Sequence, residues 1–234
     1  MAPEVYGKEH IIYLVISTLV GAVSVILLKK YAKSEKMQTV ALKISAFLLF
    51  ASILANRLSQ VFRYEQVRWY LIIPDSYCGM TSLVIGLAVL FGKKDNSLLH
   101  FSWLLGLFGG ISTSFYPTYV SQHISFFYLP TFSGLLHHSF CALTVVLLIA
   151  FKQITVTYKK WYYVILGFTC YITVGAFLMS VFKMNDAFHI AEPLLPNTSL
   201  TTWVMAPIYI VAHGLIFAII ELVNRRNKIK RVNA

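Results

Sequence analysis

Long apolar stretches separated by short polar connections make up nearly the whole chain. They lie at residues 9–28, 37–62, 71–92, 98–116, 127–151, 160–182 and 201–223. A helix of about 20 mainly apolar residues is long enough to cross the hydrocarbon core of a bilayer. The pattern therefore predicts an all-α membrane protein, with residues 1–234 forming a single domain, one bundle of seven transmembrane helices.

Composition supports this interpretation and excludes an ordinary soluble domain. Hydrophobic residues make up 58% of the chain and charged residues 12%, with a mean hydropathy of +0.69. Soluble domains contain about 25% charged residues, which they need to cover their surface. The longest connection, residues 183–200, contains two prolines, which favours an ordered loop or a short re-entrant piece over a helix.

The distribution of basic residues predicts the orientation of the helices. Lysine and arginine are retained on the cytoplasmic side of a membrane. One set of alternate connections holds 14 of them: Lys29, Lys30, Lys33, Lys36, Lys93, Lys94, Lys152, Lys159, Lys160, Arg225, Arg226, Lys228, Lys230 and Arg231. The other set holds only Lys8, Arg63, Arg68 and Lys183. We therefore expect the N-terminus outside and the C-terminus in the cytoplasm.

The same distribution bears on partners and location. The net charge of +11 would suit a nucleic-acid partner only if the basic residues covered one polar face. They lie instead beside apolar stretches, where they contact anionic lipid headgroups. We therefore expect membrane lipids and no nucleic acid as partners, in a multi-pass protein of the cell membrane, with the bacterial cytoplasmic membrane as the expected location; the pattern leaves the oligomeric state open.

Three cysteines, Cys78, Cys141 and Cys170, lie inside apolar stretches. None has the C-x-x-C or Cys/His spacing of a zinc site. The structural explanation of each cysteine is a small apolar residue that fills space between helices. The sequence predicts no disulfide framework, no metal and no cofactor.

Ionisable side chains at membrane depth are the strongest indication of a site, because each costs about 2.5–3.5 kcal/mol to insert. Those that the pattern places in the apolar stretches include Arg57, Asp75, His137, His138 and His213. In the predicted orientation most of them fall in the outer half of the bilayer. We therefore expect one outward-facing polar site in the bundle.

Each of these residues also has a structural explanation. Arg57 is long enough to reach the outer headgroups from within the membrane. Asp75 follows Pro74 and has the position of a helix N-cap. His213 would serve as a hydrogen-bond partner between helices.

The adjacent histidines His137 and His138 are harder to explain by packing alone. Neighbouring positions on a helix point about 100° apart, so the two rings should meet different partners. A metal site built from both is therefore not expected. Cys141 lies one turn further on, either as a local partner of a histidine or as filler.

Several short segments carry a resemblance to a known family. They are HIIYLV (10–15), IPDSYCGMTSLV (73–84), FSWLLGLFGG (101–110), STSFYP (112–117), LLHHSF (135–140) and NDAFHIAEP (185–193). With these segments the chain resembles the YwaF family of bacterial integral membrane proteins, whose eukaryotic relative is transmembrane protein 164. Ser76 stands where this family usually has a histidine.

The resemblance implies a lipid acyltransferase or hydrolase that depends on a membrane cysteine. Cys78 would then be the nucleophile and His138 its base, with Arg57 or an N–H group near Gly79 stabilising the oxyanion. Arg57, Asp75, His137 and His213 would bind the substrate.

Two other functions remain open at this point. One is a binding or transport module that holds a small polar or lipid ligand without turnover. The other is a structural membrane partner, whose polar groups only join helices. On any of these functions, Gly106, Gly109 and Gly110 suit close contact between the fourth apolar stretch and its neighbours.

Overall fold

The computed structural model describes residues 6–63, 65–117, 120, 125–195 and 197–232, with side chains up to residue 223. Its seven α-helices are α1 (Lys8–Tyr31), α2 (Glu35–Val61), α3 (Tyr77–Phe91), α4 (Ser97–Phe115), α5 (Leu129–Ala150), α6 (Tyr162–Phe182) and α7 (Thr202–Val232). Two short 3₁₀-helices, Trp69–Ile72 and Tyr158–Lys160, complete the described structure, and none of these residues forms a strand. The predicted all-helical class is confirmed.

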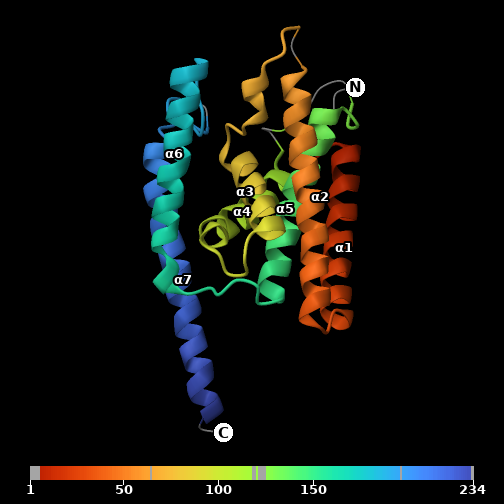
Figure 1. Cartoon of the computed structure of the whole chain (residues 1–234), viewed down its shortest axis with the longest axis vertical. Helices are drawn as coiled ribbons and strands as arrows, with labels where there is room; N and C mark the ends of the chain where they lie inside the picture. Colours follow the sequence, from red (N-terminus) through yellow and green to blue (C-terminus); the bar gives the residue numbers. More distant parts are fainter. Residues whose placement is uncertain (1–5, 64, 118–119, 121–124, 196, 233–234) are drawn as a thin grey trace. The chain divides into compact units, whose positions relative to one another are not determined.

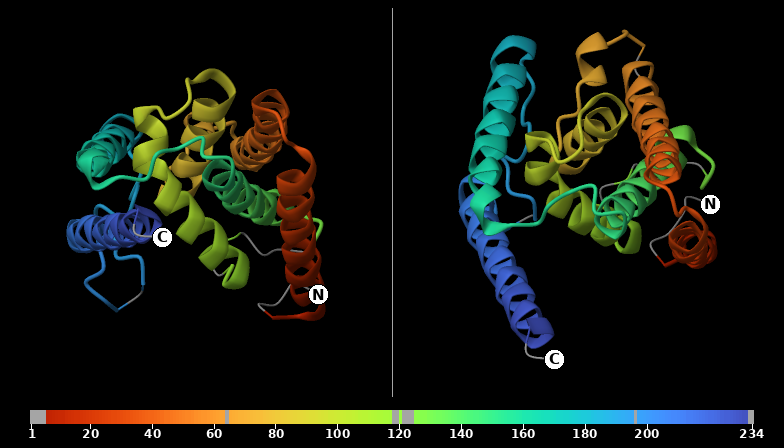
Figure 2. Two further views of the ribbon diagram at one scale, coloured as in Figure 1. Left: turned by 90° about the horizontal axis from the view of Figure 1, so that it is seen from below. Right: turned by 60° about the horizontal axis from the view of Figure 1, so that its bottom comes forward.

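The chain divides into two compact units, residues 1–153 and 154–234, called here the first and second unit. In the first unit, α2 packs most extensively on α5, and α3 and α4 pack against them (Figure 1). The second unit consists mainly of α6 and α7, which lie side by side (Figure 2). A single bundle of all seven helices remains a prediction, as does the orientation of the termini.

Six helices are long and apolar enough to cross a membrane. The exception is α3, whose 15 residues span about 22 Å at 1.5 Å per residue. The predicted span 71–92 is therefore wrong at its start. A proline restricts the residue before it to extended conformations, so Pro74 keeps the apolar segment before α3 out of the helix. That segment forms the 3₁₀-helix Trp69–Ile72 instead.

The other predicted spans differ from the helices by at most three residues, except at the end of the last one. There α7 continues past residue 223 to Val232. Hydropathy marks where the apolar part of a helix stops, whereas the helix itself continues through the basic segment that follows.

Helix α1 is the least buried helix of the first unit. Only His10 and Tyr13 of this helix are buried. The Tyr13 hydroxyl lies 2.6 Å from Ser139 Oγ on α5, and His10 Nε2 lies 2.9 Å from the carbonyl oxygen of Ser114 on α4. Two polar contacts at one end of α1 therefore fix it to the unit, while most of its apolar surface is left for lipid.

The described residues of the connection between α6 and α7 form a loop and not a helix, as predicted, and a re-entrant position of this loop remains a prediction. The Phe188 ring stacks on Tyr171 of α6, with 5.3 Å between ring centroids. The Thr202 N–H group at the start of α7 donates a hydrogen bond to the His189 carbonyl, at 2.7 Å. Loop and helices therefore form one structure within the second unit.

Candidate functional site

Arg57 of α2 fastens the segment that precedes α3. Its side chain is 11% exposed, and its Nη1 lies 3.1 Å from Asp75 Oδ1. Nε donates to the Leu71 carbonyl at 2.9 Å, and Nη2 donates to the Ile73 carbonyl at 3.3 Å. A planar guanidinium suits such a contact, because it presents several donors in a fixed fork. Arg57 therefore satisfies carbonyl groups that an irregular segment would otherwise leave unpaired.

These contacts decide between the structural explanations offered for the two charged residues. Arg57 is buried and paired, so it does not extend to the headgroups. The N-cap of α3 is Ser76, whose hydroxyl accepts a hydrogen bond from the Gly79 N–H group at 3.2 Å. The N-cap hypothesis for Asp75 is therefore wrong, because the next residue takes that position and Asp75 turns to Arg57.

Cys78 and His138 meet at one residue of α4. The Cys78 sulfur lies 3.0 Å from the point where a β-carbon on Gly109 would be. The His138 ring hydrogen-bonds to the backbone of the same Gly109, whose carbonyl is the acceptor, and Thr113 hydrogen-bonds to Cys78. Three helices thus bring a thiol and an imidazole to the same glycine.

The hydrogen bond to Gly109 has a chemical consequence for His138. A neutral imidazole carries its proton on one ring nitrogen, and a bond donated from that nitrogen leaves the other as an acceptor. The backbone of α4 therefore selects a tautomer of His138 that can accept a proton.

Other glycines of α4 permit this close approach, as the sequence predicts. A β-carbon on Gly110 would lie 2.7 Å from the backbone oxygen of His138. One on Gly106 would lie 3.0 Å from the Cys141 sulfur. Real β-carbons do not come so close to other atoms, so α4 and α5 could not pack this way with alanine at Gly110.

His137 turns to a different partner from its neighbour, as the helical spacing requires. Its Nδ1 lies 3.1 Å from Ser82 Oγ on α3, while its ring is tilted against His138 with centroids 4.1 Å apart. Cys141 hydrogen-bonds to the same Ser82. The local Cys/His pairing considered for Cys141 is therefore replaced by a contact through a serine of another helix.

His213 lies on α7 in the second unit. Its ring packs edge-on against Phe217 and Tyr209 of the same helix, at centroid distances of 4.5 and 5.5 Å. The part of the predicted site that lies in the first unit consists of Arg57 with Asp75, and of Cys78 with the two adjacent histidines. A place for His213 in that site remains a prediction.

Reasoning from the sequence missed two members of this cluster, Ser82 and Thr113. Both are small hydroxyl residues, which are common in membrane helices and seldom stand out. Their spacing gives a signal in retrospect, because Ser82 follows Cys78 by one helical turn and Thr113 follows Gly109 by one turn. A hydroxyl one turn from a candidate site residue lies on the same helix face.

Apolar helices around a thiol, two imidazoles and hydroxyl groups define a multi-pass helical membrane protein with a polar cluster inside its first unit. Comparison with known proteins narrows this class further. The chain belongs to the TMEM164 family, whose family model matches residues 5–223. This confirms the predicted relation to transmembrane protein 164, while the YwaF designation and a bacterial membrane remain predictions. Comparisons with curated proteins and with solved structures found no match.

Proposed function

We propose that the protein transfers acyl groups of membrane lipids, with Cys78 as the nucleophile and His138 as its base. The observation that carries this proposal is the meeting of both side chains at Gly109. A nucleophilic cysteine needs a base to take its proton and a third group to orient the base. The Gly109 carbonyl would serve as that third group, and Thr113 hydrogen-bonds to the thiol.

In the first step His138 takes the thiol proton, and the sulfur attacks the carbonyl carbon of a lipid ester. A new C–S bond forms, and the ester oxygen leaves with the proton from the imidazolium. The products are an acyl thioester on Cys78 and a lipid with a free hydroxyl group. This step involves no change of oxidation state and requires no metal ion.

In the second step the acyl group passes to an acceptor. A hydroxyl group of a second lipid gives up its proton to His138 and attacks the thioester, and the thiol is restored as the C–S bond breaks. Water in the place of that hydroxyl group gives hydrolysis. The accepting molecule therefore decides whether the reaction is a transfer or a hydrolysis.

The first turn of α3 supplies the group that would stabilise the oxyanion. Cys78 is the second residue of α3, and the first N–H groups of a helix have no intrahelical carbonyl partner. The positive end of the helix dipole adds to their effect on a developing negative charge. Arg57 acts on this turn indirectly, because it fixes the segment from Leu71 to Asp75 that leads into it.

The depth of Cys78 supports a lipid ester as the substrate. It lies in the first turn of α3, at the predicted outer end of the first unit. Ester groups of phospholipids lie at the boundary between headgroups and hydrocarbon, about one turn below the charged surface. A lipid can therefore present its ester to Cys78 while its chains remain in the bilayer.

Turnover by matched variants tests the proposal. The purified protein in lipid vesicles is given a phospholipid with a labelled acyl chain and a lysophospholipid acceptor, and transfer and release of the label are measured. We expect Cys78→Ser and His138→Gln each to lower the rate by at least about 10²-fold. The control Cys141→Ser removes a thiol of the same cluster and should keep most of the activity.

Equal rates in Cys78→Ser and the unchanged protein would overturn this function. So would equal losses in Cys78→Ser and Cys141→Ser, because they would indicate damage to packing and not loss of a nucleophile.

A further inference from the structure

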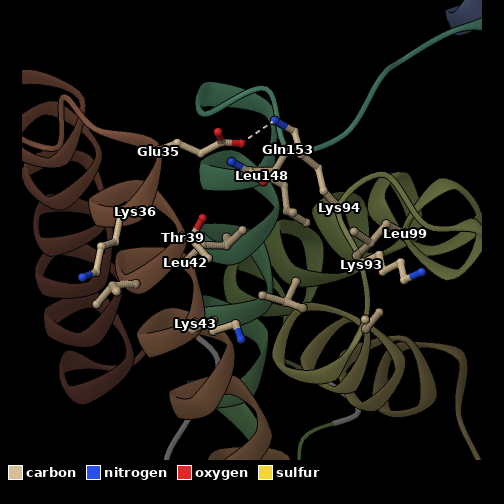
Figure 3. Close-up of a pocket in the computed structure, with 14 residues that line it drawn as sticks. Glu35, Lys36, Thr39, Leu42, Lys43, Lys93, Lys94, Leu99, Leu148 and Gln153 are labelled. Carbon is tan, nitrogen blue, oxygen red and sulfur yellow. Dashed lines mark hydrogen bonds and ion pairs between the residues drawn. The ribbon is translucent and has the colours of Figure 1, made fainter.

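A basic pocket lies at the end of the first unit opposite to Cys78. Its volume is about 510 Å³, and it is formed by the start of α2, the end of α3 with the following connection, and the end of α5 (Figure 3). Cys78 and Gly92 are 14 residues apart along α3 and its end, which corresponds to about 21 Å. The pocket is therefore separate from the Cys78 site. Its charged and polar lining residues are Glu35, Lys36, Thr39, Lys43, Lys93, Lys94 and Gln153.

The charge of this pocket is strongly positive. Lys94 Nζ lies 3.1 Å from Glu35 Oε1, so one lysine is neutralised. Within the described part of the chain, Lys36, Lys43 and Lys93 have no carboxylate partner. These three lysines give the lining a net positive charge, although the Lys36 and Lys93 side chains extend to opposite sides of it (Figure 3). A surface of this charge attracts an anion.

A buried amide points to the same kind of ligand. Gln153 is 7% exposed, and its Nε2 has no hydrogen-bond partner among the described residues. An unpaired buried donor is costly, by about 1–3 kcal/mol, and native proteins rarely keep one without a reason.

The backbone around Gln153 is firmly held, so this donor is not placed by chance. The Gln153 N–H group donates to the Leu148 carbonyl at 2.8 Å, and its own carbonyl accepts from the Asp95 N–H group at 3.1 Å. These bonds join the end of α5 to the connection after α3. The buried side chain of Gln153 therefore extends from a fixed backbone position in the wall of a cavity that is lined by lysines.

The remaining lining and the depth of the pocket favour a lipid. Apolar side chains such as Val40, Val89 and Leu148 form the rest of the lining. Lys43 lies two turns inside α2, where an ammonium group is expensive unless it faces a site. A lipid headgroup would meet the lysines and Gln153, while its glycerol and upper chains would meet the apolar side chains.

We propose that this pocket binds the phosphate of an anionic phospholipid in the leaflet opposite to the one that faces Cys78. The Gln153 amide donates one hydrogen bond to a phosphate oxygen, and the positive charge of Lys36, Lys43 and Lys93 attracts the phosphate to the pocket. The site is independent of the proposed acyl transfer, since none of its residues belongs to the Cys78 cluster. Replacement of Cys78 by serine should leave binding unchanged.

Binding of a soluble short-chain lipid tests this site. Dioctanoyl phosphatidic acid is titrated into the full-length protein in detergent, and native mass spectrometry measures the bound fraction. Dioctanoyl phosphatidylcholine and inorganic phosphate are titrated in parallel. We expect phosphatidic acid to bind at least about tenfold more tightly than phosphatidylcholine.

The variants separate the pocket from general charge. Lys43→Gln should weaken binding of phosphatidic acid roughly fivefold, and Gln153→Glu, which has the same shape but adds a negative charge, at least tenfold. The control Lys29→Gln removes an equivalent charge from the end of α1, outside the pocket, and should change little. Lys43 is exposed, so its variant keeps the test valid even if Gln153→Glu does not fold.

Two results would overturn the proposal: equal binding of the two lipids, or equal weakening by Lys43→Gln and Lys29→Gln. If inorganic phosphate binds as tightly as the lipid and shows the same dependence on Lys43, the site takes a soluble phosphate, and the lipid source is wrong.

Discussion

At the Cys78 end of the first unit, glycines let α4 approach α3 and α5 closely, and the polar groups bond to one another inside the contact. At the lysine end, the helices leave a cavity of about 510 Å³, and most of the charges have no ion-pair partner among the described residues. The first end is organised for groups that act on each other. The second end is organised for a ligand that supplies the negative charge missing around its lysines.

The ion pairs at the two ends differ in burial. Arg57–Asp75 and Lys94–Glu35 both have a shortest distance of 3.1 Å. The side chains of the first pair are 11% and 33% exposed, and those of the second are 51% and 73% exposed. Exposed pairs contribute little to stability, whereas removing one partner of a buried pair leaves a costly unpaired charge. Burial, and not distance, distinguishes the two pairs.

The largest expected difference is all or none, because the predicted topology puts the loop after α6 and the connection after α3 on opposite sides of the membrane. Ser199 lies in the loop after α6 and Lys93 in the connection after α3, both exposed. In intact cells a membrane-impermeant maleimide should label Ser199→Cys, and should label Lys93→Cys only after permeabilisation. The unchanged protein, with its own cysteines, is the control. The reverse pattern would contradict the orientation predicted from the basic residues.

Replacement of the arginine should affect stability more than replacement of the lysine. Arg57→Met leaves Asp75 and two carbonyls unpaired and should lower the free energy of unfolding by about 2–3 kcal/mol. Lys94→Met removes the exposed partner and should cost less than about 1 kcal/mol. Unfolding in detergent, followed by helical circular dichroism, measures both. Similar losses in the two variants would show that the burial of Arg57 does not matter.

A smaller effect is expected from a single methyl group in the helix contact. Gly110→Ala places a β-carbon 2.7 Å from the His138 carbonyl oxygen and should destabilise the protein by about 1–3 kcal/mol. Gly21→Ala is the matched control, because no atom lies within 4 Å of its new β-carbon. That change should be neutral or stabilising by up to about 1 kcal/mol. A Gly110→Ala variant as stable as Gly21→Ala would contradict the close contact of α4 and α5.

The apolar pattern predicted the helices well, because crossing a bilayer imposes a length that a sequence shows directly. It failed at the start of α3, where the segment from Trp69 to Ile73 is apolar but not α-helical. Hydropathy measures transfer into lipid and contains no information on backbone conformation. Pro74 was the available signal, and the contacts from Arg57 to the carbonyls of this segment were not visible in the sequence.

The sequence named residues for a candidate site but could not give their contacts, and the role of these residues remains a prediction. Cys78 and His138 were named as a pair, and the structure places both at Gly109. The sequence did not indicate that the Arg57 side chain bonds to the segment before α3, because these contacts depend on tertiary packing. It also gave no signal for Gln153, whose unpaired amide becomes informative only when its burial is known.

The most direct test of the account is to identify where an acyl group is held during the reaction. The protein in vesicles is mixed briefly with a phospholipid that carries a labelled acyl chain, quenched in acid, and digested for mass spectrometry. We predict a hydroxylamine-sensitive acyl group on Cys78, and none on Cys141 or Cys170, that is strongly reduced in His138→Gln. Acyl transfer without any label on Cys78, or equal labelling of all three thiols with and without His138, would contradict a catalytic centre at the Cys78 end.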